Sequence, residues 1–457
     1  MRYHFIGIGG IGMSGIARLV LQCGKEVSGS DVKNSALLEE LKAKGAKVFI
    51  GHDRSNVEGS DVVVYSSAVS RDNPELSAAR KMGVPVLKRA EALCELMKDK
   101  TVVTVSGSHG KTTTTSLVSY LLMEAGLSPT AVIGGIFRNI DANVCFGKGS
   151  LFVAEADESD GSFLHYLPKY SIVTNIDREH LDYYNDFSGV LASFKGFLDN
   201  TEEGGCIFAC YDDNNLKRLV EGCPRRHVFF GLDQRADVSG RNIRIEGLSS
   251  SFDCYYKGKS LGNFQLALGG EHNISNALAV IALGMELKID LAVMRKVFSE
   301  YKGAKRRLEV KFQDGHFRLI DDYAHHPTEI KATLSAAEKL GARRLIAVFQ
   351  PHRYSRTKLL LDDFARSFGP VDRLIITDIY AASEPAIEGV NKEALCARIK
   401  ELYPDKNVVA LSRDQVIPGV LKIIEPGDLL LTLGAGDITR ISDELASRLA
   451  EDKAVSA

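Results

Sequence analysis

A glycine-rich turn at residues 107–113 has the residue types of a phosphate-binding loop. It reads Gly107-Ser108-His109-Gly110-Lys111-Thr112-Thr113 and lies between an apolar, β-branched run and a helical stretch. In such a turn, backbone N–H groups surround phosphate oxygens, the lysine supplies a cation, and the threonine hydroxyl reaches a Mg²⁺ ion. The full P-loop pattern needs glycine at position 105, where this chain has Val105. We therefore interpret the turn as a shortened P-loop that binds a nucleoside triphosphate.

Acidic residues follow the next predicted strand of the same region. They are Glu155, Asp157, Glu158 and Asp160. Without the P-loop, a solvated acidic loop would be the simplest interpretation. With it, these carboxylates and His180, which follows another predicted strand, are expected to converge on the triphosphate. Mg²⁺ prefers oxygen ligands and keeps few protein contacts, so one carboxylate with the phosphates would be sufficient.

A second glycine-rich turn lies near the N-terminus. Gly7-Ile8-Gly9-Gly10-Ile11-Gly12 fits the pattern G-x-G-x-x-G after a predicted strand, and Asp31 ends the following strand. Glycines let the backbone approach a diphosphate, and a helix N-terminus favours the negative charge. The turn therefore predicts a diphosphate site, but by itself it does not distinguish NAD from a nucleotide-sugar.

Two polar segments follow strands in the last third of the chain. The first is Asp321-Asp322-Tyr323-Ala324-His325-His326-Pro327-Thr328-Glu329, in which Pro327 suits a helix start. The second is Gln350-Pro351-His352-Arg353-Tyr354-Ser355-Arg356-Thr357. Arg353 and Arg356 are three residues apart and would share one face if the segment is helical. Two guanidinium groups can hold a carboxylate through paired hydrogen bonds.

Strand-like and helix-like segments alternate along the whole chain, as in parallel sheets covered by helices. The predicted strands are 4–9, 25–31, 61–67, 84–87, 101–106, 151–157 and 170–177, and each of the segments 317–324, 343–351, 372–380 and 428–436 is predicted to contain a strand that runs into a polar or glycine loop. The predicted helices are 13–23, 112–125 and 271–287, and residues 240–268 alternate like antiparallel strands. We predict an α/β chain of three domains: a Rossmann-like domain 1–98, a P-loop ATPase-type domain 99–305 with a mostly parallel sheet, and a Rossmann-like domain 306–457.

Length and composition agree with this organisation. The 457 residues suit about three domains, with 45% hydrophobic and 25% charged residues. A net charge of -2 gives no overall basic field for nucleic acid or an anionic membrane. The eight cysteines form no C-x-x-C pair, and no run of 18 apolar residues occurs. We therefore expect reduced, mostly buried thiols and a cytoplasmic protein without a membrane span.

Seven motifs, in chain order, resemble those of the Mur ligases. They are GIGGIGMSGIA, GSHGKTTTT, AEADESD, TNIDREH, EHNISNA, DDYAHHPTE and QPHRYSRT. The resemblance covers almost the whole chain and implies domains for a UDP-sugar, for ATP and for an amino acid. It favours a UDP-sugar over NAD at the first turn. One departure is Ala324, where the family's motif has glycine.

The resemblance also implies roles for individual residues. The UDP-sugar would contact Gly7, Gly9, Gly10, Ile11, Gly12, Met13, Ser14, Asp31 and Ser66. ATP would contact residues 107–113 together with His272, Asn273 and Asn276, and the metal would contact Thr112, Glu155 and His180, with Asp157 and Glu158 as rivals. Lys111, His180, Arg307, Asp322 and His325 would be catalytic, Arg307 touching the γ-phosphate and Asp322 and His325 closing over the nucleotide. His352, Arg353 and Arg356 would bind the amino acid.

The activity that the resemblance implies is the ATP- and Mg²⁺-dependent joining of L-alanine to UDP-N-acetylmuramate. The lactyl carboxylate would be activated as an acyl phosphate, in bacterial peptidoglycan synthesis, on which cell shape and division depend. The chain would act as a monomer or weak homodimer. The alternatives are an NAD-dependent oxidoreductase, which leaves the P-loop unexplained, an ATP-switched binding module, and a ligase that attaches a preformed peptide.

Overall fold

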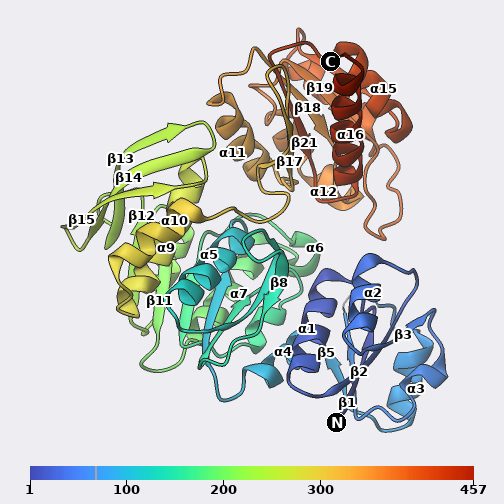
Figure 1. Ribbon diagram of the computed structural model, residues 1–457, viewed down its shortest axis with the longest axis vertical. Helices are drawn as coiled ribbons and strands as arrows, with labels where there is room; N and C mark the ends of the chain where they lie inside the picture. Colours follow the sequence, from blue (N-terminus) through green and yellow to red (C-terminus); the bar gives the residue numbers. More distant parts are fainter. Residues whose placement is uncertain (67–68, 457) are drawn as a thin grey trace. The chain divides into compact units, whose positions relative to one another are not determined.

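The β-branched and apolar runs of the sequence form the strands of three sheets in the computed structural model of the chain (Figure 1). The structure describes residues 1–66 and 69–456, apart from the side chains of Ile11, Asp182 and 452–456. The predicted strand 61–67 therefore extends beyond the described residues at 67. Two compact units contain the sheets: one comprises Met1–Asn242, Phe252–Gln265 and Asn273–Lys302, and the other comprises Ile243–Ser251, Leu266–His272 and the chain from Gly303 onward.

The first sheet consists of five parallel strands in the order β3-β2-β1-β4-β5. The strands are β1 (Arg2–Ile6), β2 (Glu26–Asp31), β3 (Lys47–Ile50), β4 (Val62–Tyr65) and β5 (Val86–Lys88). The helical segments are α1 (Ile11–Gln22), α2 (Ala36–Ala43), η1 (Arg54–Val57), α3 (Pro74–Lys81) and α4 (Arg89–Met97). The strand order reverses at β1, and ligands of open α/β sheets bind beyond the carboxyl ends of the strands at such a point.

The second sheet of the first unit has ten strands, in the order β15-β14-β13-β12-β11-β10-β6-β9-β7-β8. Its strands are β6 (Thr101–Ser106), β7 (Thr130–Phe137), β8 (Ala142–Cys145), β9 (Leu151–Glu155), β10 (Tyr170–Val173), β11 (Cys206–Cys210), β12 (His227–Gly231), β13 (Val238–Glu246), β14 (Ser249–Tyr256) and β15 (Lys259–Leu266). The strands from β7 to β13 in this order pair in parallel, and β8 is an antiparallel edge strand. The segment predicted at 240–268 forms β13 to β15, joined by two-residue turns that suit antiparallel hairpins.

Helix α5 (Lys111–Glu124) is almost completely enclosed, because every residue from Thr113 to Leu122 is buried. Some of its hydroxyl groups bond within the helix, whereas the buried Thr114 hydroxyl has no partner among the described residues. The Ser116 and Ser119 hydroxyls donate to the backbone oxygens of Thr112 and Thr115, one turn earlier. The other helical segments around this sheet are η2 (Ser162–His165), α6 (Leu181–Tyr184), α7 (Phe187–Asp199), α8 (Asn214–Glu221), α9 (Glu271–Glu286) and α10 (Leu291–Glu300).

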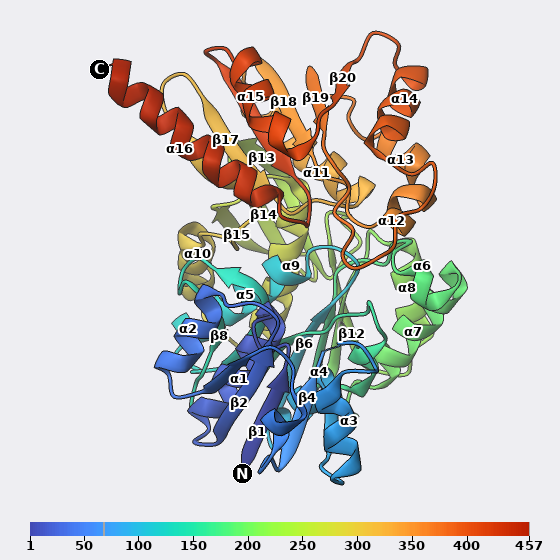
Figure 2. The ribbon, with the colours of Figure 1, turned by 90° about the vertical axis from the view of Figure 1, so that its right-hand side faces the viewer.

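The second unit contains a six-stranded sheet in the order β16-β17-β21-β18-β19-β20, parallel except for β16. Its strands are β16 (Glu309–Gln313), β17 (Arg318–Asp322), β18 (Arg344–Phe349), β19 (Arg373–Ile376), β20 (Asn407–Ala410) and β21 (Asp428–Leu433). Its helices are α11 (Pro327–Glu338), α12 (Tyr354–Leu359), α13 (Leu361–Ala365), α14 (Lys392–Leu402), α15 (Arg413–Ile423) and α16 (Ile438–Ser456). Helix α16 packs along β16, β17 and β21 (Figure 2).

Both faces of the six-stranded sheet are buried. Along β18, Ala347 and Phe349 pack into one core, whereas Ile346 and Val348 pack into the core on the opposite face. Successive side chains of a strand point to opposite faces, so a nearly continuous apolar run is what a doubly covered parallel strand requires. This burial explains why β17, β18, β19 and β21 could be predicted from apolar runs alone.

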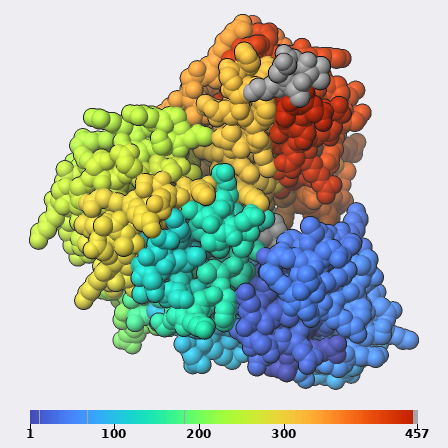
Figure 3. All heavy atoms as spheres, viewed as in Figure 1, coloured from blue at the N-terminus to red at the C-terminus, as the bar shows by residue number. Residues whose placement is uncertain are grey.

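Within the first unit, α1 packs against β7 and β8 of the larger sheet. A Cβ atom at Gly15 would lie 2.9 Å from Cγ2 of Val144, so only glycine permits this approach. Arg18, which is 8% exposed, donates to Asn143 at 3.4 Å and to Glu40 at 2.6 Å. Figure 3 shows the two segments as touching blue and teal surfaces.

The eight cysteines are all free, as expected, and five of them are buried. Burial raises the pKa of the Cys94, Cys206, Cys210 and Cys396 thiols to about 11. Cys23 is exposed. Among the described residues, no helix combines the length and the apolar character that a bilayer span needs.

Candidate functional site

The shortened P-loop connects β6 to α5 at the carboxyl end of a central parallel strand. Gly107 has a φ of +127°, and a Cβ atom there would lie 2.1 Å from Oγ1 of Thr174. Gly110 has a φ of +82° and precedes the first helical residue, Lys111. The first turn of α5 contains no acidic residue and has no side-chain cap. Its backbone N–H groups are therefore available to an anion, as in other phosphate-binding helix N-termini.

Lys111 is held inside the loop by a buried carboxylate. Its Nζ atom lies 2.8 Å from both carboxylate oxygens of Glu158 and donates to the Gly107 backbone oxygen at 2.7 Å. The side chains of Lys111 and Glu158 are 14% and 2% exposed. Although burial opposes it, the nearby carboxylates of Glu158 and Asp157 raise the pKa of Lys111. The lysine is therefore fully charged before any phosphate arrives.

Glu155 lies beside the threonine of the loop. The Thr112 hydroxyl donates to Glu155 Oε1 at 3.1 Å, and the Gly134 N–H donates to Oε2 at 2.8 Å. A Cβ at Gly134 would come within 2.5 Å of this carboxylate, so the glycine in β7 makes room for it. The structure thus brings together Thr112 and Glu155, two of the predicted metal ligands.

Three carboxylates, those of Glu155, Asp157 and Glu158, lie around the single cation of Lys111. Burial raises the pKa of Glu155, and it raises the pKa of Glu158 to about 7, while Lys111 opposes both shifts. Lys111 and the Ser159 N–H, working against burial, lower the pKa of Asp157. Mg²⁺ prefers oxygen ligands. The site offers buried carboxylates, whose pKa values burial raises, and an adjacent hydroxyl. The residues therefore fit this ion.

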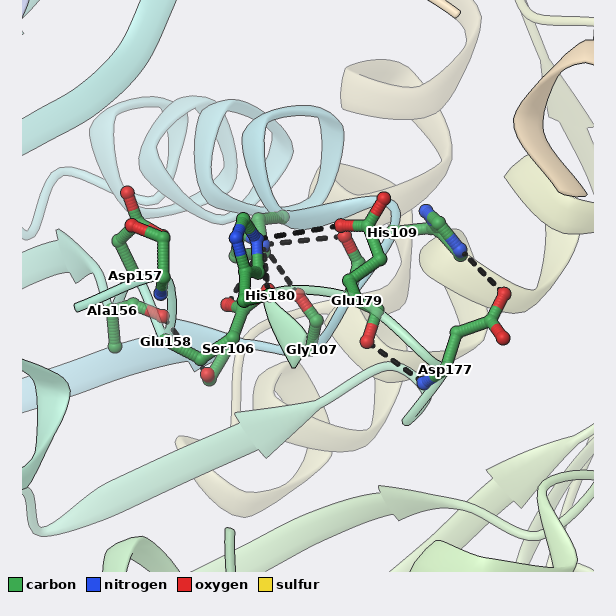
Figure 4. Close-up of polar contacts among 12 residues, drawn as sticks. Ser106, Gly107, His109, Ala156, Asp157, Glu158, Asp177, Glu179 and His180 are labelled. Atoms are coloured by element: carbon green, nitrogen blue, oxygen red, sulfur yellow. Dashed lines mark hydrogen bonds and ion pairs between the residues drawn. The ribbon is translucent and has the colours of Figure 1, made fainter. Parts of the chain in front are cut away.

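Figure 4 shows His109 beside Asp177, and His180 between Glu158 and Glu179. His109 Nε2 is 2.9 Å from Asp177 Oδ2, and the Asp177 N–H donates to the Ser108 hydroxyl at 2.8 Å. His180 precedes α6 in the left-handed region, with a φ of 56°, and its Nε2 atom lies 3.8 Å from Glu158 and 3.5 Å from Glu179. The structure therefore brings Glu155, Glu158 and His180 close to the P-loop, whereas the Asp160 carboxylate accepts the Ser162 N–H instead.

The predicted adenine-side residues lie at the start of α9. Asn276 and Asn273 are buried in the first unit, and Asn276 lies against Gly110, since a Cβ there would be 2.7 Å from its Oδ1. His272 belongs to the second unit. The residue is exposed.

The first glycine loop follows β1, whose strand ends at Ile6 rather than at residue 9. Gly7, with a φ of +76°, turns the chain, and the Gly7 N–H donates to the Ser30 backbone oxygen at 2.8 Å. The Gly9 N–H donates to Asp31 at 2.9 Å. Helix α1 then begins with no side-chain cap and no acidic residue in its first turn. This geometry suits a diphosphate.

The remaining UDP-sugar candidates lie around this loop. Ser66 Oγ would be 3.8 Å from a Cβ at Gly7. Met13 and Ser14 are buried in α1, and Ile11 opens the helix with its side chain outside the described residues. Arg89, which the sequence analysis did not single out, packs on Gly12 of the same turn, since its Nη1 atom would be 3.2 Å from a Cβ there.

In the second unit, Glu329 joins two of the predicted catalytic residues. Its Oε1 atom lies 3.4 Å from Arg307 Nη1, and its Oε2 atom accepts the His325 N–H at 3.1 Å. The guanidinium of Arg307 stacks 5.2 Å from the ring of Tyr323. Glu329, to which the sequence assigns no role, lies in the first turn of α11.

Asp322 is buried, and both of its carboxylate oxygens are used within the protein. The N–H groups of Leu308 and Ala324 donate to them at 2.7 and 2.8 Å, and the Thr333 hydroxyl lies at 3.2 Å. Burial raises the pKa of Asp322. These bonds tie the end of β17 to the segment that carries Arg307, which favours a positioning role.

The two arginines after β18 do not share a helical face. Arg353 precedes α12 with a φ of 68°, and only Arg356 is helical. Arg353 Nη1 lies 3.9 Å from Glu384, whereas Arg356 Nη1 lies 3.3 Å from His352 Nδ1. Burial, His325 and both arginines lower the pKa of His352 to about 3. The His352 ring is therefore a neutral partner for Arg356.

Three family models match the chain and together span most of it. Residues 2–101 match "Mur ligase family, catalytic domain", residues 105–284 match "Mur ligase middle domain", and residues 306–436 match "Mur ligase, glutamate ligase domain".

Individual relatives extend this similarity over the whole length. The UDP-N-acetylmuramate–L-alanine ligase of Geotalea uraniireducens (strain Rf4) is 45% identical over 452 residues, which cover 99% of this chain and 98% of that protein. The ligase of the same name from Geotalea daltonii is 46% identical and covers 98% of each chain. A solved UDP-N-acetylmuramate–alanine ligase of Thermotoga maritima superposes with a TM-score of 0.83 at 29% identity, covering 99% of this chain and all of that one.

Proposed function

The chain belongs to the Mur ligase family, and on that premise we propose that its two glycine loops and the polar groups of its second unit serve successive steps of one amide-forming reaction. The enzyme joins L-alanine to UDP-N-acetylmuramate with consumption of ATP, in the synthesis of peptidoglycan precursors. The observation that carries this function is the 45–46% identity over 98–99% of the chain to ligases of this activity.

The reaction needs activation because a free carboxylate does not react with an amine at neutral pH. Transfer of the γ-phosphoryl group of ATP to the lactyl carboxylate forms an acyl phosphate and releases ADP. The alanine amine then attacks the acyl carbon, and the tetrahedral intermediate expels phosphate. No protein nucleophile is needed, so the enzyme contributes positioning and charge neutralisation.

The residues around the P-loop neutralise the phosphates. Lys111 exchanges Glu158 for phosphate oxygens, and the N–H groups of the first turn of α5 bind the same triphosphate. Thr112 and Glu155 would hold Mg²⁺. His180, which lies near Glu158, would be the third metal ligand. Bound Mg²⁺ supplies charge neutralisation at the phosphoryl oxygens. Asn273 and Asn276, at the start of α9, serve the nucleotide side.

The first glycine loop binds the UDP-sugar diphosphate through the N-terminus of α1, with Asp31 and Ser66 at its edge. In the second unit, Arg307 serves the γ-phosphate and is held by Glu329, which also binds the backbone of His325. Asp322 positions this group, and His352, Arg353 and Arg356 serve L-alanine.

The domain boundaries 1–98, 99–305 and 306–457 follow from this division of the chain into UDP-sugar, ATP and amino-acid parts, and the matches to 2–101, 105–284 and 306–436 support them.

We further propose that the enzyme is a monomer or weak homodimer in the cytoplasm, where ATP and UDP-sugars are available. Its substrates are small molecules, and a net charge of -2 supports neither nucleic acid nor membrane as a partner.

Phosphate release from ATP tests the function. With UDP-N-acetylmuramate and Mg²⁺, we expect L-alanine to support rapid release, and L-serine and glycine to support slower release. Glycine lacks one methylene relative to alanine, which is worth only about 1–3 kcal/mol, and an apolar pocket rejects the added hydroxyl of serine by only about 10²-fold, so discrimination of about 10- to 200-fold is expected. Chelation with EDTA should stop the release and added Mg²⁺ should restore it. Equal release without any amino acid, or none with any, would favour an ATP-switched module instead.

Thermal unfolding of the full chain tests the first glycine loop. UDP-N-acetylmuramate or UDP at about 100 times its Kd should stabilise the protein by about 2.7 kcal/mol, because the ligand binds only the folded state. NADH at the same concentration should leave the melting temperature unchanged. A shift with NADH and none with either uridine nucleotide would contradict the assignment of this loop.

A further inference from the structure

Glu75 is a fully buried carboxylate that none of the roles described above uses. It lies in the first turn of α3, and its side chain is 0% exposed. Asn56 donates to its Oε1 atom at 2.6 Å, and the Ser30 hydroxyl donates to Oε2 at 2.5 Å. An ionised carboxylate at such a site is costly unless it is paired, so its partners must be numerous.

Two histidines complete the group around Glu75. His52 Nδ1 lies 3.2 Å from Glu75 Oε2 and 3.0 Å from the Ser30 hydroxyl. His4 Nε2 lies 3.7 Å from the same carboxylate oxygen, and His4 Nδ1 is 3.0 Å from the Ser28 hydroxyl. Although burial opposes it, the hydrogen bonds from His4, Ser30 and Asn56 lower the pKa of Glu75. The carboxylate is therefore charged at pH 7.

The group is connected directly to the first glycine loop. Ser30 donates its hydroxyl to Glu75, while its backbone oxygen accepts the N–H groups of Gly7 at 2.8 Å and Ile8 at 3.0 Å. The next residue, Asp31, accepts the Gly9 N–H. Glu75 therefore fixes the end of β2, and the end of β2 in turn binds three successive residues of the loop, Gly7 to Gly9.

The group also reaches the edge of the sheet at which ligands bind. Ser30 and His52 lie at the carboxyl ends of β2 and β3, two neighbouring parallel strands (Figure 1). The His52 side chain is 21% exposed, whereas Glu75 and His4 are 0% exposed. His52 is therefore the member of the trio that a bound molecule can touch.

From these contacts we infer that Glu75 is a positioning residue for the UDP-sugar: it fixes Ser30, and through Ser30 the first glycine loop, and it orients His52 at the nucleotide edge. This inference rests on the proposed assignment of the loop to the UDP-sugar. Glu75 should have no effect on the ATP and alanine steps, because the contacts of Glu75 lie within the first sheet and the segments that flank this sheet.

The test measures binding of UDP-N-acetylmuramate by calorimetry with the full-length protein. Wild-type binding is measured first, since its absence would refute the loop assignment itself and not the role of Glu75. Glu75→Gln keeps the shape but removes the charge, and it is expected to weaken binding about tenfold while the KM values for ATP and L-alanine stay within about twofold. His52→Gln should weaken binding to a similar extent, and the double variant should be no weaker than Glu75→Gln alone, because the two residues act as a unit.

Leu76→Ala is the matched control, because Leu76 is the neighbouring, fully buried residue of α3. It should lower the free energy of unfolding without changing the affinity of the folded protein for UDP-N-acetylmuramate. A Glu75→Gln protein that is less stable but binds with wild-type affinity would show a merely structural role. If Glu75→Gln does not fold, wild-type affinity in His52→Gln would equally overturn the inference.

Discussion

Replacing Lys111 by methionine is expected to lower the rate of ligation by about 10²- to 10³-fold or more, at saturating ATP. The loss follows from removing the preorganised cation beside the transferring phosphoryl group, where a single donor carries this magnitude. Lys148→Met, which removes an exposed lysine, should leave the rate unchanged. Near-normal turnover of Lys111→Met at saturating ATP would exclude the phosphate role.

The same substitution should make stability depend on pH in a specific way. Without Lys111, the buried Glu158 loses the cation that holds its pKa down to about 7, so its pKa rises further. The folded state then binds a proton that the unfolded state has released above its ordinary pKa of about 4.3. The free energy of unfolding of Lys111→Met should therefore fall as pH rises from about 4.3 to beyond 7.

Adding Glu158→Gln to Lys111→Met separates the two effects. The double variant no longer contains a buried, unpaired carboxylate, whose cost is about 3–5 kcal/mol when its partner is removed. We expect urea unfolding at pH 6 and pH 8.5 to show recovered stability at the higher pH, with ligation as slow as in Lys111→Met. A double variant that regained activity would contradict the role of Lys111.

Arg356→Lys is expected to raise the KM for L-alanine about 10- to 100-fold while the KM values for ATP and UDP-N-acetylmuramate remain nearly unchanged. A paired, charge-assisted hydrogen bond to the alanine carboxylate is worth about 1.5–3 kcal/mol, and lysine keeps the charge but not the planar fork. The structure supports Arg356 most directly, because neutral His352 lies against its guanidinium.

Arg353→Lys tests the second half of the predicted carboxylate clamp. Because the Arg353 guanidinium already lies 3.9 Å from the Glu384 carboxylate, we expect a smaller rise in the alanine KM than for Arg356→Lys. Arg366→Lys, at an exposed position after α13, serves as the control. A fall in kcat at constant alanine KM would instead indicate neutralisation of the phosphoryl group, and an unchanged alanine KM in both variants would refute the clamp.

The strands that could be predicted from the sequence are those whose residues are buried along most of their length. β6 coincides with the predicted strand 101–106, because its β-branched residues lie between two parallel neighbours. By contrast, β8 and β20 were not singled out, since short strands at sheet edges have little apolar signal. The strand predicted at 4–9 ends three residues beyond the end of β1 at Ile6, because Gly7 leaves the extended region.

The features of the candidate site also divide into those that the sequence predicts and those that depend on tertiary contacts. That Glu155 and His180 approach the P-loop followed from the meeting of carboxyl ends at one edge of a parallel sheet. The left-handed backbone of Arg353 and the pairing of Lys111 with Glu158 depend on tertiary contacts and have no local signal in the sequence. Glu75 is the extreme case, since its partners are 19 to 71 positions away in the chain.

The close approach at Gly107 constrains how such a chain can evolve. An alanine there would meet Oγ1 of Thr174 at 2.1 Å and the backbone of Asn175 at 3.0 Å, in a backbone conformation that already disfavours a side chain. Changing Thr174 would not open the position, because the backbone contacts remain and the Thr174 hydroxyl would no longer bind the His109 oxygen. No single substitution therefore leads from this loop to one with a side chain at 107. Lineages that alter it must shift the end of β10 and the loop together, so this pair of segments should diverge as one inherited unit.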